Sequence, residues 1–194
     1  MTANNTLPGD IRQISYVVRD LDATIERWLE LGIGPWYVIR SFRQRGGQYR
    51  GQAGEPLISI ALANSGELQI ELVQQEDDTP SCYTEFLDAG HEGFHHVSFW
   101  ADDFDAASAA ADGSWELVQS GDARSGYYDT GGVTSTIVEI SEMTDRFRWL
   151  SDTIREAARE WDGHTDPIRS VPPRPGWAGT ASPQGGPGAG ASNP

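Results

Sequence analysis

Four side chains able to bind a divalent cation occur at matched places in two stretches of the chain. Gln13 and His96 lie at the start of the β-forming runs RQISYVV and HHVSFWA, and Glu71 and Glu139 lie between apolar residues in LQIELV and TIVEI. Amide and carboxylate oxygens with an imidazole nitrogen suit Zn²⁺, Ni²⁺, Co²⁺, Mn²⁺ or Fe²⁺. The sequence therefore predicts one divalent metal ion held by Gln13, Glu71, His96 and Glu139.

Such a centre would have positions left for a substrate. Four protein ligands around an octahedral ion leave two positions open, where two neighbouring substrate oxygens can bind and an enolate next to a carbonyl can be stabilised. Two carboxylates that share one cavity also require a cation or a proton to offset their charge.

Each of these residues alone has a structural explanation. A single strand histidine is more often a packed or surface residue, and a glutamate between apolar strand residues commonly faces solvent. The hypothesis depends on the two pairs at matched positions. His95 is adjacent to His96, so we expect it to point to the opposite face, as a packing residue or a residue that supports a ligand.

An internal repeat would position the four side chains. Residues 12–23 (RQISYVVRDLDA) align without a gap with residues 95–106 (HHVSFWADDFDA), at an offset of 83 residues. Each copy has a β-rich run, an aspartate-containing turn with Asp22 or Asp105 as the expected helix N-cap, and a helix. Further strands are predicted at 36–42, 56–62, 115–119 and 125–129. The prediction is an α+β fold in which two βαβββ modules, 11–74 and 94–142, pair into a curved, barrel-like sheet.

Two further segments surround the modules. Residues 75–93 form the connection, with a short helix around 83–87, and an amphipathic helix is predicted at 144–161, to pack on the fold or on a second subunit. These parts make one domain, 1–162. Seven of the eleven prolines and seven of the 22 glycines lie in 163–194, which predicts a disordered tail.

The composition excludes several partners. The formal net charge is −15 and all fourteen basic residues are arginines, so nucleic acid and anionic membranes are not expected partners. The single cysteine, Cys82, has no basic neighbour in sequence and is expected to be a structural thiol. The polar N-terminus, MTANNTLPGD, and the lack of a long apolar stretch predict a cytoplasmic protein.

The combined motifs resemble the vicinal-oxygen-chelate superfamily, which includes glyoxalase I, methylmalonyl-CoA epimerase, extradiol dioxygenases and bleomycin resistance proteins. The resemblance covers about residues 10–142 and is greatest for the epimerase and glyoxalase branch. Its ligand motifs correspond here to Arg12-Gln13-Ile14, Glu71-Leu72, His95-His96-Val97 with the second histidine as ligand, and Glu139 in TIVEI.

This resemblance implies a metal-dependent isomerase, epimerase or lyase that moves a proton next to a carbonyl. It implies Glu139 as the general base, Glu71 as the corresponding acid–base residue of the first module, and a homodimer. The epimerase branch has a further acidic residue on an early strand. Glu55 is the nearest candidate, but its surroundings match poorly, which weakens the assignment to epimerases specifically.

Two other functions stay open. One is metal-free binding or sequestration of a small molecule, and the other is an oxygenase or a hydrolase on the same scaffold. An extradiol dioxygenase is disfavoured because Gln13 replaces the first histidine.

The substrate is expected to be a small carbonyl or acyl compound. Arginines in RSFRQRGGQYRG would receive a carboxylate or the phosphates of a CoA-linked acyl group, or would form a solvated loop. Aromatic residues would line an apolar pocket or belong to the core. The arginines are Arg40, Arg43, Arg45 and Arg50, and the aromatic residues are Trp36, Tyr37, Phe99 and Trp100.

Overall fold

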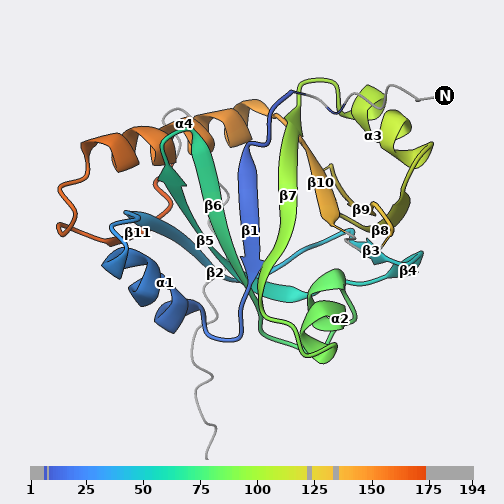
Figure 1. The fold of residues 1–194 in the computed structure, drawn as a ribbon, viewed down its shortest axis with the longest axis horizontal. Coiled ribbons are helices and arrows are strands. Elements are labelled where there is room, and N and C mark those ends of the chain that lie inside the picture. Colours follow the sequence, from blue (N-terminus) through green and yellow to red (C-terminus); the bar gives the residue numbers. More distant parts are fainter. Residues whose placement is uncertain (1–6, 8, 122–123, 133–135, 174–194) are drawn as a thin grey trace, which may run out of the picture.

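One twisted sheet is the framework of the molecule. A computed structural model of the 194-residue chain describes residues 7, 9–121, 124–132 and 136–173. These residues form four helices and an eleven-stranded sheet (Figure 1). The strand order is β11-β2-β5-β6-β1-β7-β10-β9-β8-β3-β4. No helix in the described ranges is long and apolar enough to span a membrane.

The predicted α+β fold of two βαβββ modules is confirmed. The first module consists of β1 (Gln13–Val17), α1 (Leu21–Glu30), β2 (Trp36–Arg43), β5 (Leu57–Ser65) and β6 (Leu68–Gln75). The second consists of β7 (Gly93–Ala101), α3 (Phe104–Asp112), β8 (Glu116–Gly121), β9 (Ser125–Asp129) and β10 (Ile137–Glu142). A small hairpin of β3 (Gln48–Tyr49) and β4 (Gln52–Ala53), which the sequence did not predict, extends the sheet beyond β8.

The strand pairing repeats between the modules. β1 pairs in parallel with β6, and Ser15 lies opposite Glu71, whereas β7 pairs in parallel with β10, and Ser98 lies opposite Glu139. Ser15 and Ser98 are related by the same offset of 83 residues that relates Gln13 to His96. Antiparallel pairing of β1 with β7 joins the modules at the centre of the sheet (Figure 1). Glu71 and Glu139 therefore occupy equivalent places.

The first helix of each module covers one face of the sheet. Alternating residues of a strand point to opposite faces, so Ile70 and Leu72 pack under α1 while Glu71 faces the other way. Val138 and Ile140 pack with α3 in the same manner, on either side of Glu139. We call the face covered by α1 and α3 the helix face, and the opposite face the site face.

The helix N-caps differ from the prediction. Asp20 and Asp103 accept hydrogen bonds from the backbone N–H groups of Ala23 and Ala106, both at 3.0 Å, and so cap α1 and α3. Asp22 and Asp105, the predicted caps, lie in the first turns instead. Their negative charges there interact favourably with the positive end of the helix dipole, but the capping hydrogen bonds go to Asp20 and Asp103.

Two helices outside the modules pack on the site face. The predicted connecting helix is α2 (Cys82–Asp88), which begins at a capping box of Ser81 and Thr84 and packs with Val17 and Val73. The predicted last helix is α4 (Asp145–Glu160), capped by Thr144. Its buried Ile154 packs on Tyr37 and Leu62, so α4 covers the outer strands of the first module.

The boundary predicted for the disordered tail is placed too early. Residues Ile168–Ser170 form β11, which pairs in parallel with β2 at the edge of the sheet, and the N–H of Trp36 donates to the carbonyl of Pro167 at 2.8 Å. An edge strand has unpaired backbone groups, and β11 satisfies those of β2 despite its proline-rich surroundings. The rest of the predicted tail, from residue 174, lies outside the described residues.

Candidate metal centre

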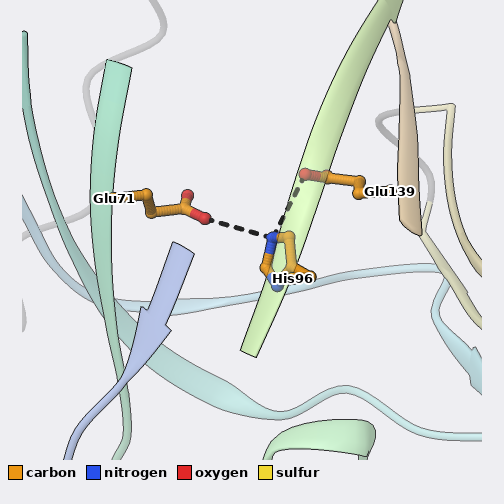
Figure 2. Close-up of side chains that lie close together, drawn as sticks. All are labelled: Glu71, His96 and Glu139. Carbon is orange, nitrogen blue, oxygen red and sulfur yellow. Dashed lines mark ion pairs between the residues drawn. The ribbon is translucent and has the colours of Figure 1, made fainter. Parts of the chain in front are cut away.

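Three of the four predicted ligands converge on the site face. His96 Nε2 lies 3.4 Å from Glu139 Oε2 and 3.6 Å from Glu71 Oε2 (Figure 2). The three donor atoms lie within 4.8 Å of one another, and theirs is the one such group of acidic, histidine or cysteine residues in the described part of the chain. We call Glu71, His96 and Glu139 the triad.

The strand register explains this convergence. Ser15 on β1 pairs with both Glu71 and His96, so it stands between the strands that carry them. Ser98 on β7 pairs with Glu139. Both serines are fully buried, and their short side chains leave room on the site face for the longer side chains of the triad to meet.

The triad is buried and charged. His96 is 0% exposed and Glu139 7% exposed, and His96 Nε2 makes no hydrogen bond although two carboxylates flank it. Burial lowers the pKa of His96, but the carboxylates of Glu139 and Glu71 that flank its ring outweigh this and raise that pKa to about 9. Without a metal ion, an imidazolium at His96 therefore offsets part of the charge of the two carboxylates.

Glu139 is held ionised by its neighbours. Burial raises the pKa of its carboxyl, but His96 and the hydroxyl of Ser141, which donates to Oε1 at 2.9 Å, lower it below its ordinary value. An ionised carboxylate can bind a cation and can also accept a proton from a substrate.

The donor set and spacing fit a divalent ion. Two donor atoms that are each about 2.1 Å from one ion lie about 3.0 to 3.4 Å apart when the angle between them is 90 to 110°. The distances of 3.4 and 3.6 Å around His96 Nε2 are within a few tenths of an ångström of this range. A cation here would replace the proton that balances the buried charge.

Gln13, the fourth predicted ligand, lies on the site face but makes no contact with the triad that the structure records. It is buried on β1, and its Nε2 donates to Gln69 Oε1 at 2.8 Å. This bond fixes the orientation of the amide. Its role as a ligand stays a prediction.

The prediction for His95 is wrong in its orientation. Its ring does not point to the helix face, because His95 Nδ1 lies 2.9 Å from His96 Nδ1. His95 also packs against Phe86 and Tyr83 of α2, with ring centroids 5.0 and 5.7 Å away. Burial, and then the charge of His96, lower the pKa of His95 to about 3, so this imidazole is neutral.

Other predicted candidates lie elsewhere. Glu55 is exposed and accepts a hydrogen bond from the backbone N–H of Gly46, so it is not part of the triad's surroundings. The Cys82 thiol is buried, and burial raises its pKa well above the ordinary value, which keeps it protonated and agrees with a structural role.

Ion pairs occupy most of the clustered arginines. Arg40 pairs with Asp22, Arg43 with Asp77, and Arg50 with both Glu85 and Glu116, while Arg45 is exposed. These guanidinium groups are therefore largely neutralised. The aromatic candidates belong to packed clusters: Trp36 and Phe99 on the helix face, Tyr37 under α4, and Trp100 against Phe147 of α4.

Tyr127 was not predicted as a site residue. It pairs with Glu139 across β9 and β10, packs edge-on to His96 with ring centroids 5.2 Å apart, and accepts a hydrogen bond from the Tyr83 hydroxyl at 3.0 Å. The equivalent neighbour of Glu71 is Leu62. Because the two modules differ here, the repeat gave no signal for Tyr127.

A cavity of about 670 Å³ reaches the immediate neighbours of the triad. Its wall includes His95 and also Ile137, which pairs with His96, and Phe86, Phe94 and Val118 add apolar surface. The triad residues themselves do not line this cavity, which lies next to α2.

Comparisons with known proteins agree with this fold. The sequence model of the family described as the Glyoxalase/Bleomycin resistance protein/Dioxygenase superfamily matches residues 12–131. The structure is similar to a methylmalonyl-CoA epimerase from Mycobacterium tuberculosis, with a TM-score of 0.50 and 20% identity over 77% of this chain and 97% of that one. A second methylmalonyl-CoA epimerase has a TM-score of 0.48 and 19% identity over 73% of this chain and 100% of its own. No curated protein sequence matches.

Proposed function

We propose that the chain, which belongs to the glyoxalase/bleomycin resistance protein/dioxygenase superfamily, is a metal-dependent isomerase, epimerase or lyase. Its reaction would remove a proton from a carbon next to a carbonyl. The observation that supports this proposal is the buried triad, in which two carboxylates and an imidazole meet at equivalent places of two modules. Gln13, Glu71, His96 and Glu139 are the proposed metal ligands.

A divalent cation at this place would offset the negative charge that develops on a carbonyl oxygen during deprotonation. The protein supplies the proton transfers. Glu139 is ionised, and Ser141 holds its Oε1, which orients the carboxylate toward His96. We assign Glu139 as the general base. Glu71, on the other side of His96, would return a proton to the substrate, or remove one from it, from the opposite direction.

The substrate is proposed to be a small carbonyl or acyl compound. Several similar structures are methylmalonyl-CoA epimerases, and one is a complex with methylmalonyl-CoA, which makes a CoA-linked acyl group one candidate. Phosphate binding by Arg43 or Arg50 would require that it leave Asp77, or Glu85 and Glu116. A substrate without phosphate groups is therefore the second candidate.

A metal-free binding protein is the alternative function. The cavity beside His95 has both apolar and charged side chains in its wall and a volume suited to a small molecule, and in the absence of metal the His96 imidazolium offsets part of the charge of the triad. Such a protein would bind its ligand without exchanging ligand protons.

Metal analysis tests the proposed centre directly. The full chain, purified without chelator and incubated in turn with Zn²⁺, Ni²⁺, Co²⁺ and Mn²⁺, should retain about one ion per chain, and Glu139→Gln should lose it. Glu142→Gln is a matched control, because Glu142 lies on the same strand but pairs with Arg124. If the unmodified chain retains none of these ions, the metal-dependent function is excluded.

Proton exchange then tests the reaction. The metal-loaded chain in D₂O should exchange the acidic α-proton of methylmalonyl-CoA or of an unesterified methylmalonate, followed by proton NMR. Glu139→Gln should slow exchange by about 10² to 10⁴-fold. Oxygen uptake without exchange would indicate an oxygenase instead, and saturable binding without exchange would indicate the binding protein.

A further inference from the structure

We propose that His95 is a positioning residue, whose Nδ1 accepts the Nδ1–H of His96 and so presents the Nε2 lone pair of His96 to the metal centre. This inference rests on the proposed function, because it assigns a role toward the metal ligand His96.

A β-bulge brings the two adjacent imidazoles together. Along β1 and β7 the pairing changes from Ser15 with His96 to Tyr16 with Phe94, so His95 has no opposing residue in β1. An extra residue of this kind interrupts the alternation of side chains and redirects one of them. The Nδ1 atoms of His95 and His96 are consequently 2.9 Å apart, within hydrogen-bond distance.

The direction of this hydrogen bond follows from the proton count. One proton lies between the two Nδ1 atoms, and a neutral imidazole has one N–H and one lone pair. For the lone pair of His96 Nε2 to bind a metal ion, the proton of the neutral His96 ring must be on Nδ1. His95 Nδ1 is then the acceptor, and His96 Nδ1 carries the shared proton. His96 Nε2, between the two carboxylates, is left as the metal-binding atom.

Aromatic packing keeps both rings in this arrangement. Phe86 lies edge-on to His95 at 5.0 Å, and Tyr127 lies edge-on to His96 at 5.2 Å. Histidine ligands usually donate their second N–H to a carboxylate, a backbone carbonyl or water, and loss of such a partner costs about 10 to 100-fold in metal affinity. Here a second imidazole would have that role.

The first test locates the proton in the Zn²⁺-loaded chain. In the ¹⁵N-labelled full-length protein, NMR should detect a ring proton on His96 Nδ1 and a ¹⁵N–¹⁵N coupling to His95 Nδ1 across the hydrogen bond. A proton on His95 Nδ1, or no proton between the rings, would overturn the proposal. If Zn²⁺ is bound and the proton lies elsewhere, the positioning role fails while the proposed metal centre stands.

The second test measures Zn²⁺ affinity of full-length variants. His95→Phe should weaken Zn²⁺ binding by about 10 to 100-fold, whereas His95→Asn, whose amide oxygen can replace the acceptor Nδ1, should restore most of it. His91→Phe is the matched control, because His91 also stacks on Phe86 but has no contact with His96. Equal Zn²⁺ affinity of His95→Phe and the unmodified chain would refute the proposal. Failure of the unmodified chain to bind Zn²⁺, Ni²⁺, Co²⁺ or Mn²⁺ would refute the proposed function instead.

Discussion

At the scale of single residues, the chemistry of the site is set by one imidazole between two carboxylates. His96 is fully buried, and its Nε2 faces the carboxylates of Glu71 and Glu139 without forming a hydrogen bond. The same atom can hold a proton or a metal ion but not both. Protonation and metal binding must therefore compete at His96.

This competition predicts proton release on metal binding. The pKa of His96 in the metal-free chain is about 9, so at pH 7 the imidazole is protonated and Zn²⁺ must displace about one proton. Glu139 has a lowered pKa and releases none at this pH. Calorimetric titration in buffers of different protonation enthalpy should give about one proton released at pH 7 and none well above pH 9. If the number of protons released is the same at pH 7 and well above pH 9, the assignment is contradicted.

At the scale of secondary-structure elements, α4 stabilises the first module without contributing to the triad. The three triad residues lie on β6, β7 and β10, whereas α4 packs on β5 and β11 pairs with β2. Both elements, like β10, follow residue 131, where the match to the family model ends. They cover the outer strands of the first module.

A core substitution in α4 should therefore separate stability from metal binding. Ile154→Ala removes a fully buried side chain between Tyr37 and Leu62 and should lower the free energy of unfolding by about 2 to 5 kcal/mol. Arg159→Ala, at a half-exposed surface ion pair on the same helix, should lower it far less, because solvent screens exposed ion pairs. Urea denaturation measures both. Below the unfolding transition, Ile154→Ala should bind Zn²⁺ like the unmodified chain, and a large loss of affinity would show that α4 acts on the site.

At the scale of the whole molecule, charge dominates the surface. The chain has 29 acidic and 14 basic residues and a formal net charge of −15. Its arginine ion pairs lie mostly at exposed or partly exposed positions in the described residues. Two copies of such a chain repel each other at long range. Any association must be driven by local contacts and opposed by net charge.

The homodimer implied by the family resemblance stays a prediction. The net charge predicts how the stability of this dimer depends on salt. Sedimentation velocity at micromolar concentration should give a species of twice 21.2 kDa. The dimer should dissociate at low ionic strength and become tighter as salt is added, because salt screens the repulsion between subunits. A monomer at all salt concentrations would refute the expected assembly.

The sequence by itself determined the duplicated fold and three residues of the site. Strand periodicity and the repeat of 83 residues matched Gln13 to His96, and the apolar residues around Glu71 and Glu139 placed both carboxylates on the face away from α1 and α3. These features depend on local propensity and alternation, which a sequence displays directly. The convergence of Glu71, His96 and Glu139 followed from them.

Tertiary structure alone decided the features that depend on pairing between distant segments. The bulge that turns His95 beside His96 arises from the register of β1 against β7, and Tyr127 reaches the site through its pairing with Glu139. Likewise, β11 forms because β2 offers an open edge, although its own composition predicted disorder. Alternation along a strand predicts which face a side chain shares, but register and edge pairing are set by the partner strand, which is remote in sequence.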